Sequence, residues 1–549
     1  MKKILLFLTI LSCIQQLFAQ KTIYHNGKIY TVDEKQPRAE AVVCEAGRIV
    51  FVGSNKDAKR WIDSKTTQID LKGRFTLPGL IDNHTHFSLG GAYLLGVDLR
   101  PAKSVAEFKS ILKKYVSEHR GQWIVIGNWD NEAWDIKELP TKEMVDEFSS
   151  DTPIFVMRLD GHTGFANSVA LKLAHITKDS PSPAGGEIVK DPKTGEPTGI
   201  LKDNPALDLV NNIIPVASPE QQRTYIERAL QEARENGITS IQDITSKADM
   251  VAYQQLIDLN KLTCRVYTRL PIADYQSLIN AGVQVGFGSD LLKLGSLKAF
   301  ADGALGSSTA LMFNAYKHIP TTKGLGSDIL LNGNLKKWAF EADKNHLQLS
   351  IHAIGDSANY LMLKMFEEII KTNPTWDRRF RIEHAQHVRL EDIPQFAKLG
   401  VIASVQPYHC IDDGSWAANR IGSRIDYMHP YKSFMKAGVK VCMGSDWYVA
   451  PLNALKGIYG AVTRRTLDGA NPFGFVPTQK ITVEEAIKAY TINNAYAAFE
   501  ETQKGSIEVG KLADMVVLSD DILTTKPEKI ADTKVLMTIF GGKVIYERK

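Results

Sequence analysis

The middle of the chain alternates short apolar runs with amphipathic stretches. Runs rich in Val, Ile and Leu predict strands at 77–81, 237–244, 262–270, 292–299, 347–353, 379–383, 401–406 and 439–444. Stretches such as 219–235 have the periodicity of helices that bury one face. Strands that alternate with helices imply parallel pairing through crossover helices. Eight such strands predict an α/β fold, a TIM-like (β/α)8 barrel over residues 77–504.

The two ends of the chain differ from this middle because their apolar runs are short and alternating. Strands are expected at 22–32, 41–52, 67–71, 513–518 and 535–546. They predict a small composite β-sandwich domain built from residues 20–76 and 505–549. The interval between the first two barrel strands is too long for one βα unit, so an insertion at about 90–215 is expected after barrel strand 1. Within it, 123–128 and 153–159 are predicted strands and 180–198 a Pro/Gly-rich loop.

The first residues have the layout of a secretory signal peptide. Lys2 and Lys3 precede an apolar run over 4–14, and Ala19 provides a small residue for cleavage. We therefore expect residues 1–19 to be removed and the mature protein to be periplasmic or secreted. A lipoprotein anchored at Cys13 is the less favoured alternative. The run is shorter than a bilayer requires, and no other stretch is long and apolar enough for a membrane span.

Composition excludes several classes of protein. The chain has 549 residues, of which 44% are hydrophobic and 23% charged, so it is neither disordered nor a small disulfide-stapled module. The net charge is +4 without a polybasic block, which gives no indication of a nucleic-acid partner. The four cysteines that follow Cys13 are scattered without C-x-x-C spacing, and we expect them to be core residues.

The clearest candidate chemistry follows the first predicted strand, in the run Pro78-Gly-Leu-Ile-Asp-Asn-His84-Thr-His86. Alternate side chains of a strand point the same way, so His84 and His86 would face one side together. They would do so at the carboxyl end of the strand, where barrel active sites lie. Two imidazoles at this spacing can share a divalent metal. Two solvent-facing histidines are the alternative for this motif alone.

Further candidates end other predicted strands. His352 and His384 each close an apolar run, as does Asp446 within Gly444-Ser445-Asp446. Imidazole and carboxylate are ligands that zinc and similar ions accept. Lys298 lies inside an otherwise apolar run, where an unpaired lysine is rare.

With these motifs, the sequence resembles the amidohydrolase superfamily, specifically its amidohydrolase-3 (YtcJ-like) branch, to which N-substituted formamide deformylases belong. The resemblance covers nearly the whole mature chain. It is carried by 78–86, Asp160-Gly161-His162, 298–309 (KAFADGALGSST), 352–356 (HAIGD), 383–387 (EHAQH) and 444–446 (GSD). It also implies the terminal β domain, which that family shares.

The resemblance implies a role for each candidate. His84, His86 and Asp446 would hold a more buried divalent metal, and His352 and His384 a second one. Lys298, carboxylated by CO₂, would bridge the two. Two zinc ions are expected, since the ligand types favour zinc, although iron, manganese or nickel would also fit. A single metal, with Lys298 unmodified and paired with Asp302, is the alternative.

The reaction implied is hydrolysis of a non-peptide C–N bond in a small amide-type substrate. Water bound to the metal would become hydroxide near neutral pH and attack the carbonyl. Asp446 would carry the proton to the leaving amine. The alternatives are a deaminase or an ester or lactone hydrolase of the same superfamily, or a non-catalytic binding protein that retains the fold.

Four further residues are expected to face the substrate or support the metal ligands. His162 and Trp129 fall in the predicted insertion, Asp302 follows Lys298, and His387 follows His384. Each has a structural role as its alternative. The sequence leaves open whether the protein is a homodimer.

Overall fold

The computed structural model describes residues 21–131, 134–136, 138–158, 163–183, 186–202 and 204–549. The predicted signal peptide (1–19) with Cys13 lies outside them. The chain divides into two compact units: unit 1 comprises Met1–Phe87 and Leu230–Lys549, and unit 2 comprises Ser88–Ala229. Within the described residues, no helix combines the length and apolar character needed to cross a membrane.

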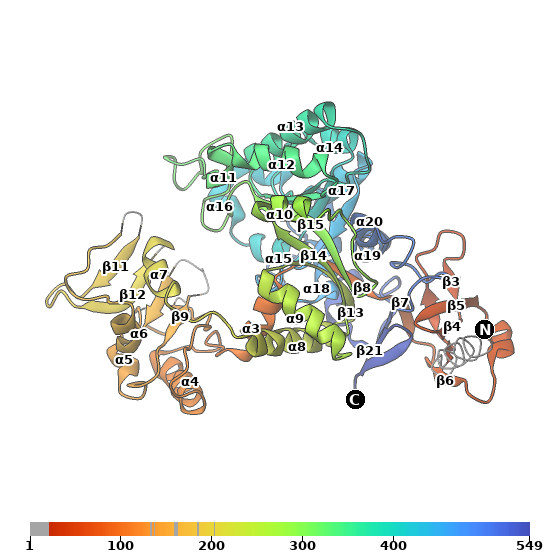
Figure 1. Ribbon diagram of the computed structural model, residues 1–549, viewed down its shortest axis with the longest axis horizontal. Coiled ribbons are helices and arrows are strands. Elements are labelled where there is room, and N and C mark those ends of the chain that lie inside the picture. The colour runs from red at the N-terminus through yellow and green to blue at the C-terminus, as the bar shows by residue number, and fades with distance from the viewer. Residues whose placement is uncertain (1–20, 132–133, 137, 159–162, 184–185, 203) are drawn as a thin grey trace, which may run out of the picture. The chain divides into compact units, whose positions relative to one another are not determined.

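Unit 1 contains the predicted barrel. Eight neighbouring strands form one parallel sheet in the order β19-β18-β17-β16-β15-β14-β13-β8 (Figure 1). The strands are β8 (Leu80–Thr85), β13 (Ile238–Ile244), β14 (Arg265–Pro271), β15 (Leu292–Phe300), β16 (Leu349–Ala353), β17 (Arg381–His384), β18 (Ile402–Val405) and β19 (Val441–Met443). The two edge strands, β19 and β8, approach each other. The amide of Asp446, shortly after β19, donates a hydrogen bond of 2.8 Å to the carbonyl of His84 on β8. The predicted α/β barrel is therefore confirmed.

The first barrel strand differs from its prediction, which placed it at 77–81. Residues on either side of Gly79 belong to different sheets: β7 (Phe75–Pro78) pairs with a strand from the carboxyl end of the chain, and β8 begins at Leu80. A Cβ atom at Gly79 would lie 2.2 Å from Oγ1 of Thr239 on β13. The close approach explains why glycine stands where the chain leaves one sheet and enters the next.

Helices cover the outside of the barrel (Figure 1). The α-helices are α8 (Pro219–Glu235), which crosses the boundary between the units, α9 (Lys247–Asp258), α10 (Tyr275–Asn280), α11 (Asp328–Leu331), α12 (Asn334–Lys344), α13 (Asp356–Thr372), α14 (Ile393–Leu399), α15 (His409–Asp413), α16 (Ala417–Ile421), α17 (Tyr431–Lys436), α18 (Ala454–Thr463), α19 (Val483–Ala489) and α20 (Ile492–Ala497). The 3-10 helices are η3 (Ile272–Asp274), η4 (Gly422–Tyr427) and η5 (Pro477–Gln479). The periodic apolar residues of α13, including Met362, Phe366 and Ile369, are buried, as expected for a helix packed on a sheet.

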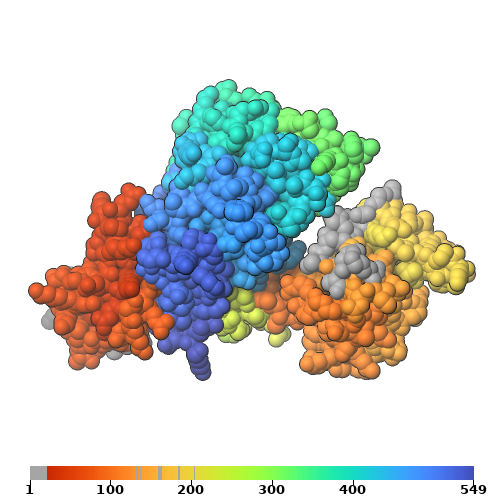
Figure 2. Space-filling model, turned by 180° about the vertical axis from the view of Figure 1, so that it is seen from behind, coloured from red at the N-terminus to blue at the C-terminus, as the bar shows by residue number. Residues whose placement is uncertain are grey.

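Strands from both ends of the chain share a sheet beside the barrel. One sheet has the order β5-β4-β1-β6, and the other β22-β21-β20-β7-β2-β3. Their elements are β1 (Thr22–His25), β2 (Lys28–Tyr30), β3 (Arg38–Ala39), β4 (Ala41–Glu45), β5 (Arg48–Gly53), α2 (Asn55–Ala58), η1 (Lys59–Trp61), β6 (Thr67–Asp70), β20 (Met515–Leu518), η6 (Pro527–Asp532), β21 (Val535–Phe540) and β22 (Lys543–Glu547). Figure 2 shows the red and blue ends side by side. A buried ion pair of 2.6 Å between Arg265 of β14 and Asp514 ties this region to the barrel.

Unit 2 has a sheet of its own, with the order β11-β12-β10-β9. Its elements are α3 (Phe87–Leu95), α4 (Val105–Glu118), α5 (Glu143–Asp146), β9 (Phe155–Met157), β10 (Thr163–Ala166), α6 (Ser168–Leu173), β11 (Glu187–Lys190), β12 (Pro197–Lys202) and α7 (Asn204–Asn211). The predicted strand at 123–128 is wrong, since only single bridges such as Ile124 to Ile154 form there. The predicted loop at 180–198 contains β11 and the start of β12, because the Asp191 carboxylate accepts the Thr194 amide and closes a tight turn.

Candidate metal centre

The barrel brings the predicted ligands to one rim. His84 lies near the carboxyl end of β8, Lys298 and His352 near the ends of β15 and β16, His384 ends β17, and Asp446 follows β19. Because the strands are parallel, their carboxyl ends face the same side. All five side chains line one cavity of about 340 Å³. Its wall also contains His86, Phe300, Leu305, Ile354, Gln386, His409, Asp412, Asp413, Trp416 and Val449.

Three of these residues form a compact set of potential metal ligands, here called the metal cluster: His84, His384 and Asp446. One ligand atom from each lies within 4.8 Å of the other two. The Asp446 Oδ1 atom is 3.4 Å from Nε2 of His84 and 3.3 Å from Nε2 of His86. His352 adjoins the cluster, with its ring centroid 4.4 Å from that of His384.

The ionisation of the metal cluster suits a cation. Burial lowers the pKa of His84 and of His384 well below the usual value, so both rings are neutral. The Asp446 carboxylate lies 3.3 Å from Nε2 of His86, where it can accept a hydrogen bond, and such a bond favours the ionised form of a carboxyl group. Neutral imidazole and ionised carboxylate are the forms that bind metals.

The backbone at two of these residues is unusual. His384 has a φ of 71° and Asp446 a φ of 61°. Left-handed backbone is uncommon for residues other than glycine, and such strain concentrates at functional sites. Both side chains line the cavity.

Lys298 is 3% exposed, and its Nζ atom lies 3.4 Å from Nε2 of His84. Among the described residues, no carboxylate forms an ion pair with it within 4.0 Å. The alternative of a Lys298–Asp302 pair is therefore not what the structure shows. The Asp302 carboxylate instead accepts the backbone amides of Leu311, Ile354 and Gly355. Burial, as the largest effect, lowers the pKa of Lys298 to about 7.

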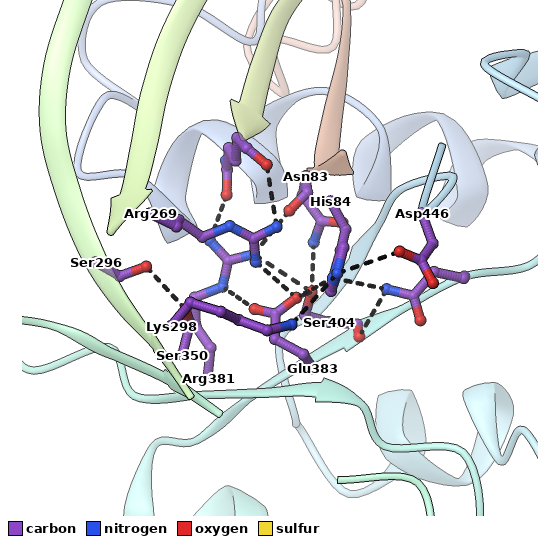
Figure 3. A network of polar contacts seen from close by, with 12 residues as sticks. Asn83, His84, Arg269, Ser296, Lys298, Ser350, Arg381, Glu383, Ser404 and Asp446 are labelled. Carbon is purple, nitrogen blue, oxygen red and sulfur yellow. Dashed lines mark hydrogen bonds and ion pairs between the residues drawn. The ribbon is translucent and has the colours of Figure 1, made fainter. Parts of the chain in front are cut away.

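A carboxylate that the sequence analysis assigned no role lies directly beside His84. Glu383 on β17 is completely buried, with Oε2 2.5 Å from His84 Nδ1. Arg269 and Arg381 contact the same carboxylate, at 2.8 and 2.9 Å. Figure 3 shows the Glu383 carboxylate among His84, Arg269 and Arg381, with the end of Lys298 reaching toward His84. The signal in the sequence was a charged residue inside a buried strand, which needs partners.

His409 is a second residue of the cavity that the sequence analysis did not single out. It lies at the start of α15, with its Nε2 atom 3.9 Å from Asp446 Oδ2. Its ring is stacked with that of His384 at a centroid distance of 6.2 Å. The signal in the sequence was a histidine shortly after a predicted strand, close to the position where His352 and His384 end theirs.

The four residues expected to face the substrate or support the metal ligands do not lie together. Trp129 lies in unit 2, fully buried, and its indole donates to the Val156 carbonyl at 2.9 Å. Asp302 holds the turns around His352 and lies 3.5 Å from Nε2 of that ring. His387 is buried, and of the described residues none forms a hydrogen bond with its ring nitrogens. His162 lies outside the described residues.

Comparison with known proteins shows the family of the chain. The amidohydrolase family, represented by a sequence model, matches residues 67–546. The chain belongs to the amidohydrolase family. This amidohydrolase is 36% identical to the protein LONG AFTER FAR-RED 3 of Arabidopsis thaliana over 95% of this chain and 91% of that one. It is 27% identical to the N-substituted formamide deformylase of Arthrobacter pascens over 95% and 98% of the two chains.

Solved structures agree with this assignment. A metal-dependent hydrolase from Pyrococcus horikoshii OT3 is similar with a TM-score of 0.79 and 27% identity, covering 92% of this chain and 99% of that one. The atrazine chlorohydrolase TrzN of Arthrobacter aurescens TC1, solved with zinc, has a TM-score of 0.51 and 14% identity over 96% and 95% of the chains, a likeness of fold. The amidohydrolase described here is thus a hydrolase on a TIM-like barrel.

Proposed function

We propose that this amidohydrolase is a metal-dependent enzyme that hydrolyses a non-peptide, amide-type C–N bond in a small molecule. The observation that carries the proposal is the convergence of His84, His384 and Asp446 within 4.8 Å at the carboxyl rim of the barrel. The name of the formamide deformylase relative, which describes cleavage of a C–N bond, supports the reaction type.

The residues present fit a divalent metal. Two neutral imidazoles and one carboxylate converge, a donor set that zinc accepts and that iron or manganese also tolerate. The Nδ1 atom of His384 is buried without a hydrogen-bond partner, an arrangement that is costly unless something binds nearby. His84, His86 and Asp446 would hold one ion, and His352 and His384 a second.

Lys298 is proposed to bridge the two ions as a carbamate. The neutral amine is the form that reacts with CO₂: the Nζ–C bond forms and a proton is released. The resulting carbamate is an anion at the end of a long side chain. An unmodified ammonium group would instead place a positive charge near Arg269, Arg381 and the metals. The structure supports this because Lys298 has no carboxylate partner among the described residues and reaches His84.

Asp446 would carry out the proton transfers of the reaction. A bound divalent metal supplies Lewis acidity, which makes water more acidic and polarises a carbonyl. Asp446, ionised at the cavity wall, would accept the proton of the attacking water as the C–O bond forms. The same carboxyl would return that proton to the nitrogen as the C–N bond breaks. The products are a carboxylic acid and an amine.

The cavity suits a small, partly apolar substrate. Phe300, Leu305, Trp416 and Val449 present apolar surface, and Gln386 and His409 add polar groups. A mostly apolar pocket with a few placed polar groups is typical of small-molecule sites.

The test is turnover by the purified, zinc-loaded protein with a panel of N-formyl and N-acyl amines, measured as release of free amine. Esters and lactones in the same panel test the rival reactions. Amine release that disappears in the Asp446→Asn variant supports the proposal. Cleavage of esters alone, or no turnover by a protein that has bound metal, would contradict it.

A further inference from the structure

We propose that Glu383 is a positioning residue for His84. It fixes the proton of His84 on Nδ1 and so directs the Nε2 lone pair into the metal cluster. The inference rests on the proposed function only in that the cluster binds a metal. It assigns a role to a buried carboxylate that touches neither the cavity nor the substrate.

Both oxygens of Glu383 form an ion pair with an arginine, and of the two only Oε2 also has hydrogen-bond partners among the described residues. Oε2 lies 2.5 Å from Nδ1 of His84 and 2.8 Å from a guanidinium nitrogen of Arg269, and it accepts the Ser404 hydroxyl at 2.7 Å. Oε1 lies 2.9 Å from Nε of Arg381. The four partners come from four different barrel strands, β8, β14, β17 and β18, so the barrel itself holds the carboxylate in place.

The two arginines are also held rigidly. Arg269 donates to the Gln242 carbonyl at 3.0 Å, and Arg381 donates to the Asn83 carbonyl at 3.0 Å. Both side chains are completely buried. Asn83 precedes His84 on β8, so Arg381 contacts both the carboxylate and the backbone beside the ligand (Figure 3).

This surrounding keeps Glu383 ionised. Guanidinium nitrogens of Arg269 and Arg381 lie 2.8 and 2.9 Å from its two oxygens, and all three side chains are completely buried. Two buried cations in contact with a carboxylate stabilise its charged form. An ionised carboxylate can only accept hydrogen bonds. The 2.5 Å contact therefore requires a proton on His84 Nδ1. Gln406 Nε2 also lies 3.3 Å from Nδ1, but the carboxylate is nearer and carries the charge.

A neutral imidazole with its proton on Nδ1 has its lone pair on Nε2. That atom faces Asp446 Oδ1 and Lys298 Nζ, both at 3.4 Å. A carboxylate behind a ligating histidine also raises the basicity of the ring and restrains its rotation. Glu383 would therefore increase metal affinity without touching the ion.

The variant test is Glu383→Gln, which keeps the shape and removes the charge. We expect the Kd for zinc, measured by competition with a chelating dye, to rise about 10–100-fold, as for other outer partners of ligating histidines. Ser404→Ala, which removes one neutral donor to the same oxygen, should change the Kd by a smaller factor. An unchanged Kd in folded Glu383→Gln would overturn the inference.

A matched control separates positioning from general stability. Asp514→Asn disrupts another buried ion pair of unit 1, with Arg265, outside the cavity. It should lower the unfolding temperature and leave the zinc Kd unchanged. If Asp514→Asn weakens zinc binding as much as Glu383→Gln does, Glu383 has only a structural role and the inference fails.

A second measurement needs no variant of Glu383. In metal-free wild-type protein labelled with 15N-histidine, the ring shifts of His84, assigned by their loss in His84→Asn, report which nitrogen carries the proton. We expect Nδ1–H, and Nε2–H would overturn the inference even if Glu383→Gln does not fold. Failure of the wild type to bind zinc would instead contradict the proposed function, which keeps the two outcomes distinct.

Discussion

Two buried histidine clusters lie in the same barrel and differ in what their nitrogens contact. In the metal cluster, His84, His384 and Asp446 face one another around a common point. The second, here called the His429 cluster, comprises Gln386, Cys410, Asp413, His429 and Tyr431. There, His429 Nε2 lies 3.2 Å from Asp413 Oδ2 and Nδ1 lies 3.2 Å from the Tyr431 hydroxyl.

The two clusters differ in whether the protein itself provides partners for both ring nitrogens, which separates a structural histidine from a candidate ligand. The protein satisfies both nitrogens of His429, and Gln386 and Cys410 extend the same chain of hydrogen bonds at 2.8 and 3.4 Å. His84 has Nδ1 in contact with Glu383, and its Nε2 atom faces Asp446 and Lys298. Burial alone does not distinguish the two cases. The direction of the remaining lone pair does.

The largest expected difference between the two clusters is the effect on zinc binding of substituting a candidate ligand. His384→Ala should weaken zinc binding by more than the ~10–100-fold effect of an outer partner, because it removes an atom of the cluster. Tyr431→Phe in the His429 cluster removes only a hydroxyl and should leave the zinc content at the wild-type value. Elemental analysis of both variants measures the difference. Equal zinc content in the two would mean that the clusters are not different in kind.

Asp446→Asn tests whether the metal cluster also carries out the proposed reaction. An amide cannot accept the proton of water, so kcat for amine release should fall by about 10²–10⁴-fold, the range for a lost general acid–base group. Tyr431→Phe is again the control, with kcat close to that of the wild type. Retention of wild-type kcat in Asp446→Asn would show that another group carries the proton.

Lys298→Met tests the proposed bridge. Methionine fills a similar volume but cannot react with CO₂, so the metal content should fall from about two ions to about one if a carbamate links two sites. Carbon-13 spectra of wild-type protein equilibrated with labelled bicarbonate should show a carbamate signal that Lys298→Met lacks. Identical spectra and metal content would leave Lys298 as an unmodified lysine.

The smallest expected effect concerns stability and pH in the His429 cluster. Burial raises the pKa of Asp413 to about 7, so the folded protein holds this carboxyl protonated where the unfolded chain ionises it. Its contribution to stability is complete below its usual pKa and is lost as the pH rises through about 7.

Relative to Asp413→Asn, the wild-type free energy of unfolding should therefore decline by up to about 1.4 kcal/mol per pH unit between about pH 4 and about pH 7, then level off. Urea unfolding at several pH values measures it. A difference between the two proteins that does not vary with pH would show that Asp413 is ionised in the folded state.

Local pattern predicted the barrel and placed the candidate ligands at the ends of its strands, whereas the contacts between distant segments could not be read from it. His352, His384 and Asp446 could be placed because each follows an apolar strand, and parallel strands end at one rim. The charge network could not be predicted, because His84 and Glu383 are 299 residues apart in sequence. The hydrophobic pattern of a strand does not predict which side chains of other strands its inward-facing residues will contact.

The errors have equally specific causes. Residues 75–85 are continuously buried, so their pattern gives no sign that the chain changes sheets at Gly79. For Lys298, a pair with Asp302 is the alternative that the sequence leaves open to a carbamate. The structure gives the Asp302 carboxylate to three backbone amides instead.

The most direct test of the metal cluster is the metal content of the purified wild-type protein, measured by elemental analysis after reconstitution with zinc in the presence of CO₂. We expect about two zinc ions per chain, held by the histidines and Asp446 and lost on treatment with a strong chelator. Absence of bound metal under these conditions would contradict the proposed metal centre, because the histidines and Asp446 would then not act as ligands.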